Sequence, residues 1–366
     1  MSTDASIIVD RRSIICFKNV TFSNYATKDV IKELTTKLAS QHINLSQHWA
    51  AELICSGATS QLFDIIMDNF CIHINVSNPR LPGYFLQRFG EVKKRIVDLS
   101  KVDPLQVRND PIVRTVFCEI IGVLCLSSQK KLITKPRIPA EDLTLEGIAR
   151  RRRLTSATPA AGLFRTGDPT ECLSPINELY DAMIRRDTGR TIYWIYWLWD
   201  WDAARRRAYG SNVCVVRGHD TIPAKLATDV IWLIYEVIML ASTTLPSDAA
   251  LAPRACLELY KKEYCESGSI IVRRKRLPLI QIAAQFVAER PPLLPLVINT
   301  GILSAMTRNV NNLYVEIKKQ TADLVTAVAP EGCSVGEKKT STKKKADVQI
   351  EDASIKNMDL LMALEL

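Results

Sequence analysis

The feature that most constrains this chain is an aromatic run of ten residues, Tyr193–Asp202, which contains four of the six tryptophans. On a helix, one continuous face would be formed by the i, i+3, i+4, i+7 set Trp194, Trp197, Leu198 and Trp201. Apolar residues also cover the other sides of such a helix, and the run is far too short to cross a bilayer. A strand is the alternative, because aromatic residues favour sheets, but no turn residues lie nearby. The sequence therefore predicts a buried helix whose indoles belong to the core.

The rest of the chain favours an all-α fold, because aliphatic residues dominate, glycine is scarce and long segments lack helix breakers. We expect two helical halves packed around the tryptophan-rich helix. The predicted order is an N-terminal arm (1–25), a first helical half (26–132), a long loop or insertion (133–176), a second helical half (177–330), and a flexible linker with an amphipathic tail (331–366). A loop as long as 133–176 is more often functional or flexible than a simple connection.

Positive charge is clustered along the chain, whose formal net charge is +9. Such clusters suit phosphates, acidic proteins or anionic lipid headgroups, although solvated helix ends have the same composition. The clustered residues are Arg150, Arg151, Arg152, Arg153, Arg205, Arg206, Arg207, Arg273, Arg274, Lys275 and Arg276. Arginines beside exposed indoles could stack on nucleic-acid bases, but Ile195 and Leu198 would then have to be exposed as well, so we favour the core interpretation.

The last dozen residues form a short amphipathic pattern after a lysine-rich linker. Helical spacing puts four apolar side chains on one face: Ile355, Met358, Leu361 and Met362. A tethered amphipathic end usually docks in a groove of a partner or of its own body. The tail is therefore predicted to bind a partner.

No enzyme or cofactor signature is present in the sequence. The chain lacks the P-loop pattern, the dinucleotide-binding glycine motif, a nucleophile elbow and C-x-x-C, and its histidines are not spaced with cysteines as metal ligands. Asp68 followed by Glu91 and Lys93 imitates a nuclease triad, but that site requires paired strands and these residues lie in apparent helices. We therefore expect no catalytic residue, no metal and no cofactor.

The ten cysteines lie mostly within apolar runs, the N-terminal residues do not resemble a signal peptide, and no apolar run has the length of a transmembrane helix. We expect reduced, buried thiols in an intracellular protein that is soluble or peripheral to a membrane.

Several stretches taken together resemble a family of helical proteins carried by nucleocytoplasmic large DNA viruses, such as chlorella viruses and mimivirus relatives. They span roughly residues 48 to 290 and comprise Ala51–Gly57, Asn78–Pro82, Tyr193–Leu198, Asp229–Ile234 and the segment from Leu259 through Arg273–Arg276 to Glu289. The resemblance implies a minor capsid protein that lies beneath the major capsomers and bridges them.

That role implies contacts with the major capsid protein and other minor capsid proteins, and with an anionic inner membrane surface. It also implies a location on the inner surface of the capsid in the virion, or in the host cytoplasm during assembly, with no small-molecule substrate. The alternative is a nucleic-acid-binding accessory factor of viral replication, transcription or packaging. A third hypothesis, an enzyme of unrecognised type, requires a pocket with converging titratable residues.

Overall fold

The computed structural model describes residues 4–210, 214–217, 222, 226–266 and 274–327. The predicted all-α fold is confirmed: within these residues the chain forms helices and no strand, apart from one isolated antiparallel bridge between Val20 and Ala26. The predictions for the tail residues Ile355, Met358, Leu361 and Met362, and for Arg273, lie outside the described residues.

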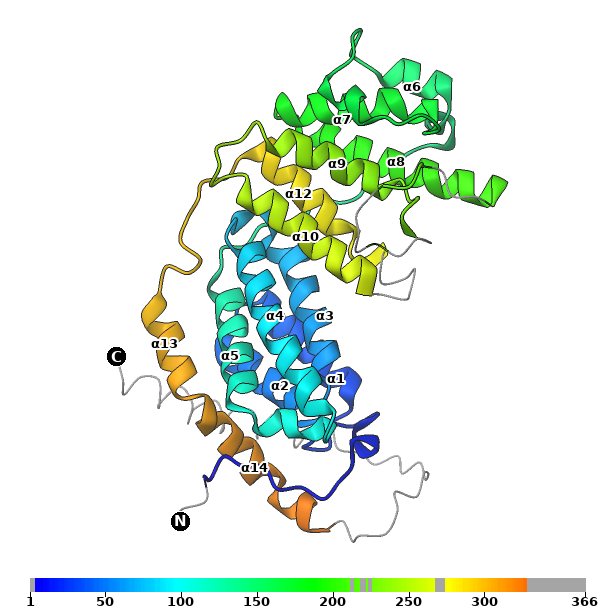
Figure 1. Cartoon of the computed structure of the whole chain (residues 1–366). Helices are drawn as coiled ribbons and strands as arrows, with labels where there is room; N and C mark the ends of the chain where they lie inside the picture. Colours follow the sequence, from blue (N-terminus) through cyan, green and yellow to red (C-terminus); the bar gives the residue numbers. More distant parts are fainter. Residues whose placement is uncertain (1–3, 211–213, 218–221, 223–225, 267–273, 328–366) are drawn as a thin grey trace. The chain divides into compact units, whose positions relative to one another are not determined.

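Two compact units make up the chain, and both are discontinuous in sequence. Unit 1 comprises Met1–Ile74, Arg88–Ser128 and Val297–Leu366, and unit 2 comprises Asn75–Gln87 and Gln129–Leu296. This division differs from the two predicted halves, because the last long helices belong to the same unit as the first ones. The orange and brown helices α13 and α14 in Figure 1 are therefore part of unit 1.

Unit 1 is built on α2 and α5, which are buried along most of their lengths. Asp110 caps α5 by accepting a hydrogen bond from Val113 N at 3.0 Å, and Pro111 occupies the first turn, where a missing N–H costs nothing. The helices of the unit are η1 (Ile14–Phe17), α1 (Thr27–Ala39), α2 (Ile43–Cys55), α3 (Thr59–Asn69), η2 (Phe70–Ile74), most of α4 (Leu81–Ser100), η4 (Pro104–Asn109), α5 (Pro111–Leu126), α13 (Thr300–Arg308) and α14 (Val310–Ala327).

A glycine explains how α13 packs so closely on α5. A Cβ added to Gly122 would lie 2.7 Å from Leu303 Cδ1 and 2.9 Å from Met306 Cε, so only a residue without a side chain leaves room for both. Spacing along the sequence cannot reveal such a contact between residues about 180 positions apart. This is a physical reason why the final helices were predicted in the other half.

The N-terminal segment is part of unit 1 in this structure, where we had expected an arm extending to neighbours. Ser6, Ile8, Phe17 and Phe22 are all buried. Some of its polar bonds end on the helical body: Ile8 N donates to Asn109 Oδ1, and Asn109 Nδ2 donates to the carbonyl of Ile8, both at 2.9 Å. The buried side chains of Ile8, Phe17 and Phe22 supply enough apolar contact to hold such a segment in place.

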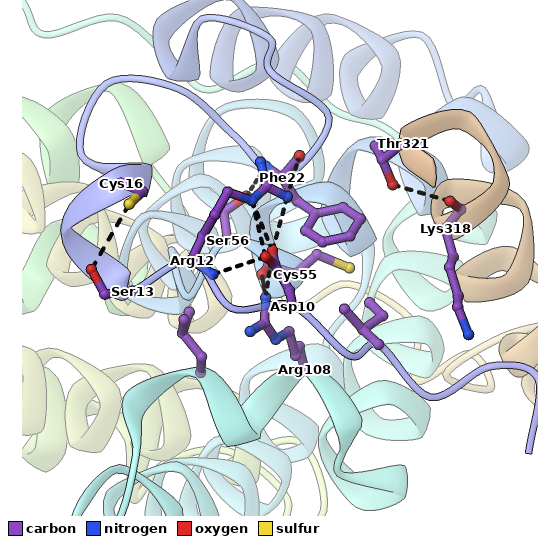
Figure 2. Close-up of polar contacts among 12 residues, drawn as sticks. Asp10, Arg12, Ser13, Cys16, Phe22, Cys55, Ser56, Arg108, Lys318 and Thr321 are labelled. Atoms are coloured by element: carbon purple, nitrogen blue, oxygen red, sulfur yellow. Dashed lines mark hydrogen bonds and ion pairs between the residues drawn. The ribbon is translucent and has the colours of Figure 1, made fainter. Parts of the chain in front are cut away.

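Figure 2 shows the ion pairs that fasten this segment. Asp10 accepts from Arg12 Nε at 2.9 Å and lies 3.5 Å from Arg108 Nη1, which also donates to the carbonyl of Cys55. Arg12 in turn donates to the carbonyl of Phe22 at 3.0 Å and lies over its ring. The carboxylate of Asp10 is almost fully buried, and its two arginine partners offset the cost of that burial.

Unit 2 is organised around α12 (Leu277–Glu289), which packs against α7, α8, α9 and α10. The tryptophan-rich helix α8 packs mainly on α7 and α12, so the central position that we had expected for α8 belongs to α12. The other helices are η3 (Asn75–Ser77), η5 (Ala140–Leu143), α6 (Leu145–Arg151), η6 (Pro159–Leu163), η7 (Thr170–Cys172), α7 (Leu173–Ile184), α8 (Thr188–Tyr209), α9 (Ile231–Ser242) and α10 (Leu251–Glu266).

The stretch 133–176, predicted as a long loop or insertion, is a chain of short helices joined by irregular segments. Buried acceptors on α7 hold it: Asn177 Oδ1 accepts from both the N–H and the hydroxyl of Thr158 at 2.6 Å, and Glu178 Oε1 accepts from Leu154 N at 2.7 Å. The backbone N–H groups of Leu154 and Thr158 are thereby satisfied outside regular elements.

Candidate binding pocket at the end of the aromatic helix

Three of the four indoles of α8 are interior. Trp194, Trp197 and Leu198 have no exposed surface, and Trp201 is 6% exposed. Trp197 Nε1 donates to the carbonyl of Asp142 at 2.7 Å, which satisfies its polar atom inside the protein. These residues therefore fill the interior of unit 2, in the positions that the helical spacing predicts.

The fourth indole, Trp199, is half-buried and lines a cavity of about 250 Å³. The cavity lies beside the C-terminal half of α8 and belongs entirely to unit 2. Its walls come from α8, the residues at the start of α9, the end of α10 and one residue before α12. The lining residues are Trp199, Asp202, Ala203, Arg206, Arg207, Asp229, Ile231, Tyr264 and Arg274.

Arg206 is fixed at the cavity wall by two carboxylates. Its Nε donates to Asp202 Oδ2 at 2.8 Å, and its Nη2 is bonded to Asp229 Oδ1. A helical i, i+4 relation brings Asp202 to Arg206, whereas Asp229 comes from the segment that leads into α9. The spacing that pairs Asp202 with Arg206 is local in the sequence, whereas Asp229 is 23 positions away from Arg206.

Asp202 is the most unusual group in the pocket. Burial raises the pKa of its carboxyl group to about 6, and the ion pair with Arg206 offsets that rise only in part. Its second oxygen, Oδ1, is buried and has no hydrogen-bond partner among the described residues. A buried acceptor without a donor is costly, so a bound group that reached this oxygen with an O–H or N–H would be stabilised.

Most of the other clustered arginines have carboxylate partners within unit 2. Asp142 lies 3.6 Å from Arg150 Nη2 and 2.9 Å from Arg151 Nη2, and Glu171 lies 2.8 Å from Arg205 Nη1. Arg153 lies 3.5 Å from Asp187, and Arg276, which is buried, lies 3.3 Å from Glu263. The basic clusters that stand out in the sequence thus act largely as internal ion pairs.

Three clustered arginines are exposed and form no ion pair with a carboxylate in the described part of the chain: Arg152, Arg207 and Arg274. Two of these, Arg207 and Arg274, line the cavity. Arg207 is separated by 67 positions from Arg274, so the sequence clusters did not indicate that the fold brings them to one pocket. Lys275 neighbours Arg274 and is exposed.

A second buried charge cluster was missed because its members are isolated in sequence. Arg217 has no exposed side-chain surface; it is ion-paired with Asp168, and its Nη1 lies 3.0 Å from Glu236 Oε2. Arg217 Nη1 also donates to the carbonyl of Leu163 at 2.7 Å. The network fastens the 163–168 segment and residues 214–217 to α9. The ion pairs and the carbonyl bond all join segments of unit 2 to one another, so we assign this cluster to the fold.

Thiols and imidazoles in the described residues serve packing. Burial raises the pKa of Cys118 and of Cys214 to about 12, so neither is a thiolate near neutral pH. Burial also lowers the pKa of His48 to about 4, which keeps its ring neutral beside Trp49. The described residues contain no group of three His, Cys, Asp or Glu side chains suited to a metal ion.

Comparison of the chain with protein-family models, curated proteins and solved structures found no match. Among the helices of the described residues, none is both long and apolar enough to span a bilayer.

Proposed function

We propose that this protein is a non-enzymatic structural protein whose helical units act as a scaffold in a larger assembly. On the strength of the sequence resemblance, we further propose that the assembly is the capsid of a large DNA virus, with the chain as a minor capsid protein beneath the major capsomers. The proposed partners are the major capsid protein, other minor capsid proteins and an anionic inner membrane surface.

The observation that carries the scaffold proposal is how the conspicuous side chains are used. Three indoles of the aromatic run are interior, and most clustered arginines are paired with carboxylates of the same unit. These residues stabilise the two helical bodies, which supports a role in which a defined shape is the functional property.

Unit 1 also exposes aliphatic side chains close to η4, which suits contact with a neighbouring protein. Val9, Ile15 and Val102 are 75%, 74% and 79% exposed. The side chains of Ile14 and Leu105 both approach the position of a Cβ on Gly57, which brings η1 close to η4. These exposed side chains are the surface that we propose contacts a neighbouring protein.

The capsid proposal is tested on purified particles of the parent virus. We expect the chain to be present in a fixed ratio to the major capsid protein and to remain with the particle after nuclease treatment. Detection in replication compartments alone, with none in particles, would overturn it.

The contact surface is tested separately by Ile15→Glu with Val102→Glu, which should reduce incorporation into particles at least tenfold. Leu145→Glu is a matched control, because Leu145 is 68% exposed and belongs to unit 2. Equal incorporation of both variants would contradict the proposed contact surface and leave the particle test to decide the scaffold proposal.

Nucleic-acid binding is the second candidate function, favoured by the exposed arginines Arg152, Arg207 and Arg274. It predicts DNA affinity that falls steeply as salt is raised. Affinity that does not change with salt, or no binding at low salt, would remove this candidate.

A further inference from the structure

We propose that the cavity beside Arg206 is a binding site for a protonated phosphate group, either inorganic phosphate or the phosphate of a small phosphorylated molecule. This role is separate from the scaffold function and runs against the sequence-based expectation of no small-molecule ligand. The cavity, the arginines that line it and one unpartnered acidic oxygen are the three observations that carry it.

The position of Arg206 is fixed by two carboxylates before any ligand arrives. Its Nε is used by Asp202, and one N–H of its Nη2 is used by Asp229. A guanidinium has five N–H donors in a rigid fork, so three remain for a ligand at the cavity wall. Because the fork is already held, binding an anion costs little further side-chain entropy.

The charged residues on the wall determine the sign of the charge in the pocket. Arg206, Arg207 and Arg274 place three guanidinium groups on the wall, and Asp202 and Asp229 supply two carboxylates. Both carboxylates are bonded to Arg206, whereas the guanidinium groups of Arg207 and Arg274 have no carboxylate partner among the described residues. The pocket therefore attracts an anion, and arginine groups match the geometry of phosphate oxygens.

The unpartnered oxygen of Asp202 distinguishes phosphate from other anions. Asp202 is 7% exposed, and its Oδ1 is buried and has no donor among the described residues. Hydrogen phosphate carries an O–H that can donate to this oxygen while its other oxygens accept from the arginines. Sulfate carries no proton near neutral pH and cannot donate. A site that needs a hydroxyl donor discriminates strongly against an analogue that lacks it.

The remaining walls limit the size of the ligand. Trp199 is half-buried and Tyr264 is buried, so the phosphate has aromatic surface beside it on which a ring can pack. The volume of about 250 Å³ lies below the range of roughly 300–1,000 Å³ that drug-sized ligands occupy. The ligand is therefore a small phosphorylated compound or phosphate itself.

The test measures binding of inorganic phosphate and of sulfate to the full chain at pH 7 by titration calorimetry. We expect phosphate to bind at least tenfold more tightly than sulfate. We also expect the double variant Arg207→Gln, Arg274→Gln to weaken phosphate binding at least tenfold, while Arg152→Gln, an exposed arginine outside the cavity, leaves it unchanged. Absence of phosphate binding, equal binding of the two anions, or an equal loss in Arg152→Gln would overturn the proposal.

Asp202→Asn tests the assigned acceptor, because its amide nitrogen can donate to either anion. We expect the preference for phosphate over sulfate to shrink at least fivefold in this variant, with its helical content checked by circular dichroism. An unchanged preference in a folded variant would contradict the role of Asp202. If the variant does not fold, the ratio of the two anions for the unmodified chain still decides the proposal.

Competition experiments identify the source of the phosphate. A mononucleotide that displaces inorganic phosphate supports a free phosphorylated compound, and displacement by a 5′-phosphorylated but not a 5′-hydroxyl oligonucleotide supports the end of a nucleic acid. Displacement by both oligonucleotides equally would overturn a site for a terminal phosphate and favour general binding to the nucleic-acid backbone.

Discussion

The guanidinium of Arg114 lies over the ring of Tyr314, with its central carbon 3.8 Å from the ring centroid. The same guanidinium donates to the hydroxyl and carbonyl of Ser6 at 3.0 Å and to Asn109 Oδ1 at 3.1 Å. One side chain on α5 thus joins the N-terminal segment, η4 and the C-terminal helix α14. Arg114 is 2% exposed, so these contacts replace nearly all of its hydration.

Replacing Arg114 by Met should remove these bonds while keeping the apolar stem. We expect the free energy of unfolding in urea to fall by about 2–4 kcal/mol, because several buried acceptors lose a charged donor. Arg152→Met, at an exposed position, should change it by less than about 0.5 kcal/mol. An Arg114→Met protein as stable as the unmodified chain would show that the contacts of Arg114 with Ser6, Asn109 and Tyr314 do not stabilise unit 1.

Replacing Arg217 should cost more stability than replacing Arg114, because neither Arg217 nor Asp168 has exposed side-chain surface. Arg217→Met should cost about 3–5 kcal/mol, since it leaves the carboxylate of Asp168 buried without its partner. The double variant with Asp168→Asn should cost less than the sum of the two single changes. Additive costs in this double-mutant cycle would argue against a coupled pair.

Stability should depend on pH through Asp202. The pKa of this carboxyl in the folded chain is raised from 3.8 to about 6, so the folded state holds a proton that the unfolded state has already released. The contribution of this carboxyl group to the free energy of unfolding is therefore fully present below about pH 4. As the pH rises to about 6, the free energy of unfolding falls by up to about 3 kcal/mol.

The check is the unfolding free energy of the unmodified chain minus that of Asp202→Asn, measured across this range. The groups that face Asp202 in the pocket are Arg206, Asp229, Arg207 and Arg274. They are common to both proteins, so their own titration largely cancels. The difference should fall as pH rises from 4 to 6, and a flat or rising difference would contradict the raised pKa.

Gly122→Ala tests the contact between α5 and α13. The added Cβ would meet the flexible ends of Leu303 and Met306, so we expect a loss of about 1–2 kcal/mol from overpacking. Gly90→Ala is the control: a Cβ there meets nothing within 4 Å, and alanine should stabilise α4 by about 0.5–1 kcal/mol. Leu303→Ala should reduce the cost of Gly122→Ala, and equal effects of the two glycine changes would refute the close approach.

Local signals predicted local structure well. The spacing of the tryptophans predicted which face of α8 is interior. Helix α4 begins at Leu81, although prolines stand at positions 79 and 82. Pro82 lies in the first turn of that helix, where its missing N–H is not needed.

Long-range relations were not predictable from one sequence. The partners of Arg206 and Arg114 include Asp229 and Tyr314, which are 23 and 200 positions away. No periodicity links such residues, and an isolated arginine in an apolar run, as Arg114 is, carries no cluster signal. A single charge on an otherwise apolar helix face was the available hint, since such a charge must find a buried partner.

The position of Arg114 between the N-terminal segment and α14 also affects how the protein folds during synthesis. Its partners Ser6 and Tyr314 are among the first and the last described residues to leave the ribosome, and Lys318 Nζ reaches back to the carbonyl of Ile7 at 2.9 Å. During synthesis, the earliest helices must therefore wait, incompletely covered, until α14 has emerged. Unit 2, which is completed by Leu296, can assemble before unit 1 closes.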